Sequence, residues 1–320
     1  MLACDLCYVG IINRQVSKSG ELVKILLATD GSEHSEGAAR FLTRLNLSHD
    51  DEIIIFHAIY GVPCLYGRES YYDTLEAMKK ETAPRTLDSA MAILESVKAK
   101  ISTLILDGFP EHCIIDVSVE SDTDLIVLGA KGMKASESYF IGSVTRAVAI
   151  QSPKPVLVIK LPKSGKRDRL KILFATDGYE HSAATAGILS GIPFPRDTEI
   201  TILNVIPWEF LDIPKEYVPD INKSFKEIIE ETRSNRLMES KRIFDQSREY
   251  LMKNFTDIHE LVKFGEPQTE IINAAEESGA DLLAVGCRGL RGIKGMMGSV
   301  SRNIFTESKC SVLIGRACEG

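Results

Sequence analysis

Two glycine-rich segments are the residues of this chain best suited to holding a phosphate group. The first, Gly-Ala-Lys-Gly at residues 129–132, is followed after nine intervening residues by Gly-Ser at 142–143. The second, Gly-Cys-Arg-Gly at 286–289, is followed after eight intervening residues by Gly-Ser at 298–299. Each segment follows an apolar run that begins with an aspartate. A strand that opens into a glycine-rich loop and then a helix N-terminus gathers backbone amides around an anion. The pattern therefore predicts two phosphate sites.

The glycines and serines of these segments suit different parts of such a site. At Gly129 and Gly132 we expect the chain to leave a strand sharply and to let its backbone approach a ligand, which a Cβ would obstruct. Gly142 stands just before a helix whose free amides favour an anion. Ser143 or Ser299 can cap that helix and donate its hydroxyl to a phosphate oxygen. The alternative, a long loop with a Gly-Ser helix cap and no ligand, stays open.

The same order of signals occurs twice along the chain. Residues 23–31 recur at 170–178, and Glu-His-Ser comes soon after each copy. The chain therefore consists of two copies of one unit of about 150 residues, which is an ordinary domain size. We expect an N-terminal extension over 1–21, a first domain over 22–162, a linker over 163–169 and a second domain over 170–320.

Within each unit, apolar runs alternate with helical patterns. We expect the first strand to end at Asp30 or Asp177, and an apolar stripe from Leu87 to Leu104 predicts one long helix. Apolar strands that alternate with helices form a parallel sheet covered on both faces, so each unit is predicted to be an α/β domain with a five-stranded parallel sheet. Such sheets bind ligands at the carboxyl edge, where strand order reverses. The closing strands at 156–159 and 311–314 are apolar edges, and we expect them to pair with pseudo-two-fold symmetry.

Composition narrows the class of protein. The net charge of −7 argues against non-specific nucleic-acid binding, which needs a basic face. No apolar run approaches the roughly 18 residues that span a bilayer, and the first residues lack the basic region of a signal peptide. We therefore expect a cytoplasmic protein that binds neither nucleic acid nor membrane. The seven cysteines do not recur between the halves, so they are not a disulfide framework. The role of Cys4 and Cys7 stays open, and Cys287 is interpreted as a small residue in a tight turn.

Histidines and acids form no repeated catalytic set. His34 and His181 recur, and the simplest interpretation is a solvated helix start. His57 is replaced by Asn204 in the second copy, so it is not a shared catalytic base. Of the repeated side chains, only Asp30 and its counterpart in the second copy are placed to hold a metal or to orient water.

Together these motifs resemble the universal stress protein family in its tandem two-domain form, over residues 22–162 and 170–316. The resemblance implies adenine-nucleotide alpha hydrolase-like (Rossmann-like) domains that bind ATP or AMP, with or without Mg²⁺. It places the aspartate after the first strand beside the adenosine, and the backbone after the second strand's histidine against adenine. The second copy departs from the family's nine-residue spacing by one residue, for which its basic side chains are expected to compensate. The residues that the resemblance implies for binding are Thr29, Asp30, Ala58, Gly129, Gly132, Gly142, Ser143, Val144, Thr176, Asp177, Val205, Gly286, Arg288, Gly289, Gly298, Ser299 and Val300.

The leading functional hypothesis is a cytoplasmic stress or regulatory protein that binds ATP or AMP in each domain and has no strong catalytic apparatus. A slow ATP hydrolase or phosphotransferase that uses the same crevice is one alternative. A ligand-free interaction module is another. The expected partners are the adenine nucleotide and the other domain of the same chain, and homodimerisation stays open.

Overall fold

The structure is a computed structural model that describes residues 22–60, 69–132, 141–161, 169–207, 223–287 and 297–316. The expected N-terminal extension, residues 163–168 of the expected linker and the centres of both glycine-rich loops lie outside these residues. The same holds for Cys4, Cys7, Arg288 and Gly289. The side chains of residues 69–73 and 223–226 are also outside the description.

Strands and helices alternate through both halves of the chain. The elements of the first half are β1 (Lys24–Ala28), α1 (Glu33–Leu42), β2 (Glu52–Ile59), α2 (Glu69–Leu94), β3 (Lys100–Asp107), α3 (Pro110–Glu120), β4 (Leu125–Gly129), α4 (Ser143–Gln151) and β5 (Val156–Ile159). Those of the second half are β6 (Lys171–Ala175), α5 (Glu180–Gly191), β7 (Glu199–Ile206), α6 (Lys223–Leu251), β8 (Asp257–Phe264), α7 (Pro267–Ser278), β9 (Leu282–Cys287), α8 (Ser299–Glu307) and β10 (Ser311–Arg316). The order confirms the α/β class.

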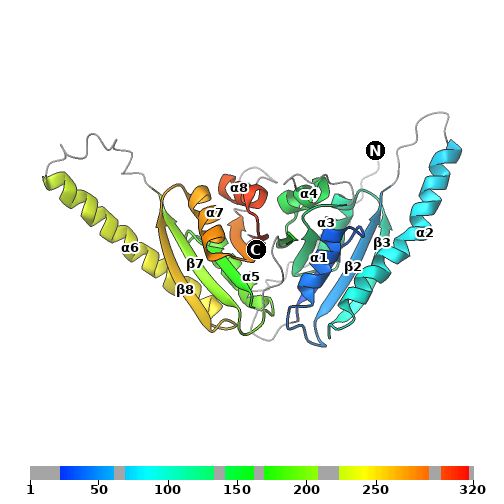
Figure 1. Cartoon of the computed structure of the whole chain (residues 1–320), viewed down its shortest axis with the longest axis horizontal. Coiled ribbons are helices and arrows are strands. Elements are labelled where there is room, and N and C mark those ends of the chain that lie inside the picture. The colour runs from blue at the N-terminus through cyan, green and yellow to red at the C-terminus, as the bar shows by residue number, and fades with distance from the viewer. Residues whose placement is uncertain are drawn as a thin grey trace, which may run out of the picture.

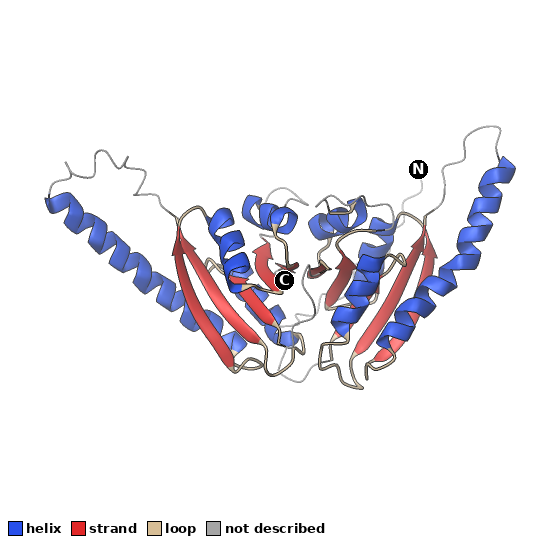
Figure 2. Cartoon of the chain, viewed as in Figure 1, coloured by secondary structure: helices blue, strands red, loops and turns tan. Residues whose placement is uncertain are grey.

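In the part of the chain that the structure describes, the strands form one ten-stranded sheet in the order β3-β2-β1-β4-β5-β10-β9-β6-β7-β8 (Figure 2). Neighbouring strands are parallel within each half. The two halves meet where β5 pairs with β10 in antiparallel orientation. Leu157 lies opposite Leu313, its equivalent in the repeat. The register is symmetrical about this pair. Figure 1 shows the two halves with matching elements on either side of the middle of the molecule.

Almost every residue of the central strands is buried, because helices cover both faces of the sheet. Ile25 and Leu27 of β1 pack with residues of α1 and α2, whereas Leu26 and Ala28 pack with residues of α3 and α4. Each of these two cores continues through β5 and β10 into the second half. The continuous apolar runs of the sequence are thus explained by a sheet whose central strands are covered on both faces.

Two boundaries differ from the sequence-based expectation. The first strand of each half ends at Ala28 or Ala175, so the aspartates follow the strand instead of ending it. The prediction of one apolar helix stripe up to Leu104 was wrong, because α2 ends at Leu94 and Leu104 belongs to β3. The residues from 100 onward pair with β2, and this tertiary contact overrides a chance helical spacing.

The outermost helices, α2 and α6, run beyond the ends of the strands that they cover (Figure 1). They are 26 and 29 residues long. Their length comes with many charged side chains, and no helix among the described residues is both long and apolar enough to cross a membrane.

Candidate functional site

The strand order reverses between β1 and β4, because β1 connects onward to β2 on one side and pairs with β4 on the other. The equivalent reversal in the second half lies between β6 and β9. Ligands of open parallel sheets bind at the carboxyl edge of such a reversal. The turn after β1 and the glycine that ends β4 both lie at this edge, so the fold brings the two predicted parts of the first site together.

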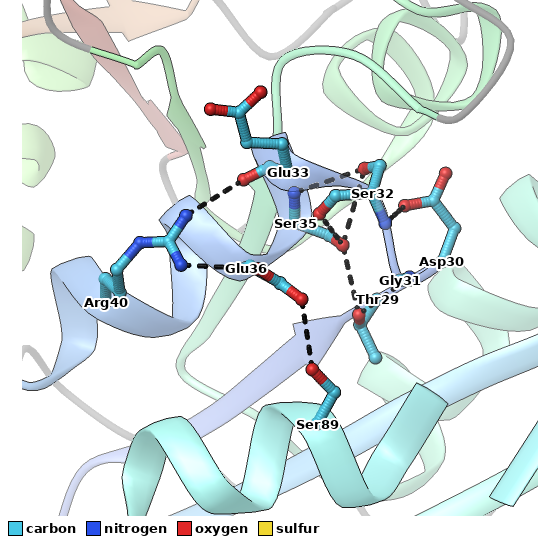
Figure 3. A network of polar contacts seen from close by, with 9 residues as sticks. All are labelled: Thr29, Asp30, Gly31, Ser32, Glu33, Ser35, Glu36, Arg40 and Ser89. Carbon is cyan, nitrogen blue, oxygen red and sulfur yellow. Dashed lines mark hydrogen bonds and ion pairs between the residues drawn. The ribbon is translucent and has the colours of Figure 1, made fainter. Parts of the chain in front are cut away.

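The turn after β1 is held by a network of short polar contacts (Figure 3). Thr29 Oγ1 accepts a hydrogen bond from the Gly31 amide at 3.2 Å and donates to Ser35 Oγ at 3.1 Å. Asp30 Oδ1 accepts from the Ser32 amide at 3.1 Å, and Ser32 Oγ caps α1 by accepting from the Ser35 amide. Gly31 has φ +77°, a conformation that favours glycine. The turn therefore presents Asp30 from a rigid backbone.

Gly129 is required by the packing of the fold, and its predicted contact with a ligand stays a prediction. A Cβ at Gly129 would lie 2.5 Å from the carbonyl carbon of His34 and 2.7 Å from the amide of Ser35. A Cβ at Gly286 would lie 2.9 Å from the carbonyl oxygen of His181. In both halves, then, the first turn of the helix after the first strand, α1 or α5, rests on the end of β4 or β9, and only glycine leaves room for its backbone.

Gly132 brings the loop after β4 against the aspartate of the first site. A Cβ at Gly132 would lie 2.5 Å from Asp30 Oδ2. Ser32 Oγ also donates to the carbonyl of Lys131 at 3.3 Å, which joins the two loops. The Gly142 amide donates to the carbonyl of Ala130 at 2.9 Å and draws the two ends of the glycine-rich loop together. Residues a hundred positions apart in the sequence are thus placed in one small region.

Gly142 and Gly298 are the N-cap residues of α4 and α8. The serines that follow are the first helical residues, so the expectation that Ser143 or Ser299 caps the helix was wrong. Val144 and Val300 come next, in the first turn of each helix. Thr145 Oγ1 donates to the carbonyl of Gly129 at 2.8 Å and anchors the start of α4 on the end of β4. Ser301 makes the equivalent bond to Gly286 at 2.8 Å.

Neither the backbone angles nor the described neighbouring atoms require glycine at the two N-cap positions. Gly142 has φ −59° and ψ 151°, and Gly298 has φ −58° and ψ 154°, which any residue can adopt. A Cβ at Gly142 would meet its nearest described atoms at 3.6 Å, and a Cβ at Gly298 would meet none within 4 Å. No described atom therefore crowds the space beside either helix start. The first amides of a helix have no partner inside the helix and can serve an anion there.

A contact shared by both sites joins the second strand to the turn. His57 Nδ1 lies 2.8 Å from the carbonyl oxygen of Thr29, and Asn204 Nδ2 donates to the carbonyl of Thr176 at 2.8 Å. Ser240 Oγ donates to Asn204 Oδ1 at 2.7 Å. The exchange of histidine for asparagine therefore preserves one contact, which the sequence could not show because the two residues differ in type. The next residues, Ala58 and Val205, are the penultimate residues of β2 and β7.

The second site holds its aspartate differently. Asp177 Oδ1 accepts from the Tyr179 amide at 3.2 Å and from Ser182 Oγ at 3.0 Å. Cys287 is the buried last residue of β9 and not a filler in a turn, which corrects that interpretation. Arg288 and Gly289 lie outside the described residues, so the predicted basic part of the loop stays a prediction.

The recurring histidines are partly buried. His34 Nδ1 and His181 Nδ1 are buried and have no hydrogen-bond partner among the described residues. Burial, together with the nearby charge of Lys131, lowers the pKa of His34, so this imidazole is neutral at pH 7. Within the described ranges, no group of three or more His, Cys, Asp or Glu side chains is gathered for a metal ion.

Comparison with known proteins shows which family this chain matches. The sequence profile of the universal stress protein family matches residues 22–160 and 169–316. A universal stress protein of Thermus aquaticus is 32% identical over 136 residues, which are 42% of this chain and 97% of that protein. A universal stress protein of Mycolicibacterium smegmatis is 23% identical and aligns with 91% of this chain and 96% of its own length.

A solved structure extends the comparison to the whole fold. The crystal structure of a universal stress protein from Archaeoglobus fulgidus matches 92% of this chain and 98% of that chain, with a TM-score of 0.58 and 21% identity. This likeness shows a shared two-domain fold. Because the family profile matches both halves, the chain belongs to the universal stress protein family as a tandem two-domain member.

Proposed function

We propose that each domain binds one adenine nucleotide, ATP or AMP, at the carboxyl edge of its sheet. The observation that carries this proposal is that no described atom crowds the N-cap glycines of α4 and α8, which stand beside helix amides that favour an anion. The phosphates would lie at these helix starts. Asp30 and Asp177, in the turns after the first strands, would accept hydrogen bonds from ribose hydroxyls, and the backbone at Ala58 and Val205 would meet adenine.

Binding without rapid turnover is the form of the proposal that the side chains support. The carboxylates are the only titratable residues at each site that the sequence placed for metal or water, and phosphoryl transfer needs several such groups in position. Mg²⁺ would then be coordinated by the ATP phosphates, with Asp30 or Asp177 nearby. A single-turnover assay with ATP and Mg²⁺ tests the hydrolase alternative: turnover that is lost in Asp30→Asn and Asp177→Asn would favour the enzyme.

The N-cap glycines supply the direct test. Valine fits the backbone angles of Gly142 and Gly298 without strain, so the substitutions should leave the fold intact and place methyl groups where the phosphates approach. In calorimetric titrations of the full chain with ATP and with AMP, Gly142→Val should remove one of two binding events. The double variant with Gly298→Val should remove both. Ala92→Val, on the exposed surface of α2, is the matched control.

Two outcomes separate the proposal from its alternatives. Unchanged affinity in the double variant would place the nucleotide elsewhere on the chain. Absence of any nucleotide binding by the unmodified protein, including nucleotide retained through purification, would favour a ligand-free interaction module.

We further propose that the β5–β10 pairing joins the two domains of one chain in solution. Leu157 and Leu313 lie opposite each other, at a separation suited to a disulfide. The double substitution Leu157→Cys and Leu313→Cys should therefore give an intramolecular cross-link on mild oxidation, detected by peptide mass spectrometry. A cross-link between two chains would instead indicate a homodimer with exchanged domains. The cytoplasmic location stays a prediction, which cell fractionation can test.

A further inference from the structure

Each domain extends a cation from the end of its last strand to the last helix of the other domain. Arg316 is the final residue of β10, and Lys160 follows the final residue of β5. The two residues occupy the same position in the repeat, directly after Gly315 and Ile159. Their contacts across the domain boundary are therefore reciprocal.

Arg316 joins the second glycine-rich loop to the helix of the first site. Its Nη2 atom donates to the carbonyl oxygens of Ala149 and Ile150 at 2.6 and 2.9 Å, at the C-terminal end of α4. Its Nη1 atom lies 3.2 Å from Sγ of Cys287, where the loop of the second site begins. One guanidinium thus touches structural parts of both sites.

Lys160 makes the mirrored contact on α8. Its Nζ atom donates to the carbonyl oxygens of Phe305 and Ser308 at 3.0 and 2.5 Å, at the C-terminal end of that helix. Ile159, the residue before it, accepts a hydrogen bond from the amide of Ala130 in the first glycine-rich loop. Lys160 is largely buried, and burial lowers its pKa to about 8.

The two helices concerned carry the proposed phosphate sites at their other ends. Each has nine residues, a rigid rod of about 13 Å at 1.5 Å per residue. Its N-terminus faces the phosphate site of its own domain, and its C-terminal carbonyls bond the cation of the other domain. A cation at a helix C-terminus complements the helix dipole. Figure 1 shows α4 and α8 flanking the middle of the molecule, where the domains meet.

We propose that Arg316 and Lys160 are positioning residues that couple the two nucleotide sites, so that nucleotide bound in one domain raises the affinity of the other. The inference rests on the proposed nucleotide binding. A phosphate at the start of α4 holds this helix in the position in which its carbonyls bond Arg316. The fixed guanidinium in turn holds the start of the second loop at Cys287, and the contact of Lys160 with α8 acts in the reverse direction. Coupling of this kind is reciprocal by thermodynamic necessity.

The test uses full-length protein with one site blocked. In the Gly298→Val background only the first site binds ATP, and Arg316→Gln, a change in the other domain, should weaken that site because the C-terminal end of α4 loses the cation that holds it. In the Gly142→Val background, Lys160→Gln should weaken the second site similarly. Arg316→Lys should restore part of the affinity. Arg248→Gln, which removes an exposed ion pair with Glu260 in the second domain, should change neither site.

Unblocked protein supplies the cooperative readout. Calorimetry should show two ATP-binding events with positive cooperativity, and the Arg316→Gln, Lys160→Gln double variant should bind two ATP independently. A second measurement applies even if Arg316→Gln fails to fold. Adding ATP to Gly298→Val protein should shift the amide NMR signals of Cys287 and Arg316, although that ATP binds in the first domain.

The outcomes separate this inference from the proposed function. Two independent sites in unmodified protein, or an unaltered first site in the Arg316→Gln variant, would overturn the coupling and leave nucleotide binding intact. Amide NMR signals of Cys287 and Arg316 that do not shift when ATP binds to the Gly298→Val protein would also overturn it. If the unmodified chain binds no ATP at all, the proposed function fails first.

Discussion

The two domains preserve their hydrogen bonds more strictly than their residues. The carbonyl after the first strand is held at 2.8 Å by His57 in domain one and by Asn204 in domain two. The side chain of asparagine is shorter than that of histidine, and its amide oxygen needs a hydrogen-bond donor. Ser240 of α6 supplies that donor. The comparison teaches that a polar contact can outlast the side chain that makes it, provided that a neighbour compensates for the new polar atom.

The turns after the first strands differ in how the next helix begins. Ser32 caps α1 with its hydroxyl, whereas the corresponding residue of domain two, Tyr179, makes no side-chain cap bond among the described residues. There the hydroxyl of Ser182 turns to Asp177 instead. The first domain therefore stabilises its helix start through the cap, and the second stabilises its carboxylate.

The largest expected difference between the domains concerns the glycines under the helix starts. Gly129→Ala should destabilise the protein by about 3 kcal/mol, the upper end for overpacking, because its Cβ would lie 2.5 Å from backbone. Gly286→Ala should cost only about 1 kcal/mol, since its closest backbone atom is at 2.9 Å. Urea unfolding measures both. Gly142→Ala, at an open position, should stay within about 0.5 kcal/mol of the unmodified protein, and equal costs for all three would refute the packing argument.

The second difference concerns the equivalent residues Lys160 and Arg316: Lys160 can lose its proton at moderately alkaline pH, whereas Arg316 cannot. The folded-state pKa of Lys160 is about 8, below its ordinary value of 10.5. The folded protein therefore binds fewer protons between about pH 8 and 10.5, and its stability rises with pH across this window. The stability of the unmodified protein relative to Lys160→Arg should increase by about 1.4 kcal/mol from pH 7 to pH 9.

The neighbouring thiol must be removed to make this measurement clean. Cys310 faces Lys160, and burial raises the pKa of its thiol. Both proteins should therefore carry Cys310→Ala. Parallel pH profiles of the two proteins would show that Lys160 keeps its proton throughout this range.

The helix caps should give a smaller effect. Ser32→Ala should lower stability by about 1 kcal/mol, the usual value of an N-cap. Tyr179→Ser should raise stability by up to about 1 kcal/mol, because Tyr179 is 68% exposed and has the extended backbone of an N-cap residue. Thermal unfolding followed by circular dichroism measures both. No gain in the second variant would mean that the Ser182–Asp177 bond already stabilises the start of α5.

The smallest expected effect is a difference in salt dependence between the sites. Residues 286–298 contain Arg288, Arg291 and Lys294 and no acid, whereas residues 129–142 contain Lys131 and Lys134 opposed by Glu137. Exposed charges are screened over about 8 Å at physiological ionic strength, whereas helix amides in direct contact are less affected. Between low and physiological salt, ATP affinity should fall roughly threefold more at the second site than at the first. The double substitution Arg288→Gln and Arg291→Gln should remove this difference. If the affinities of the two unmodified sites fall equally with salt, the backbone alone binds the phosphates.

Much of the fold could be predicted because the apolar pattern repeats. Strands that are apolar throughout indicate a doubly covered parallel sheet, and two copies of the same signals indicate two domains. Where local pattern was ambiguous, prediction failed: the helical spacing up to Leu104 crosses a helix end, a turn and an edge strand. Only pairing with β2 decides between helix and strand at these residues.

The candidate site shows the same division. The sequence by itself indicated that Asp30 and Gly129, which stand at or near the ends of two strands, would lie at one edge of a parallel sheet. It could not distinguish a glycine that leaves room for a ligand from one that leaves room for backbone. Only the structure shows that Gly129 leaves room for the backbone at the start of α1, whereas no described backbone crowds Gly142.

The sequence therefore determined the repeated domain, its parallel sheet and the chemistry gathered at each carboxyl edge, since these follow from periodicity and spacing along the chain. Only the tertiary structure decided which side chains reach across from one domain to the other. Arg316 and Lys160 stand in unremarkable polar positions after apolar strands, and nothing near them in the sequence indicates a partner. They acquire their role because antiparallel pairing of β5 with β10 turns each strand end toward the other domain's last helix.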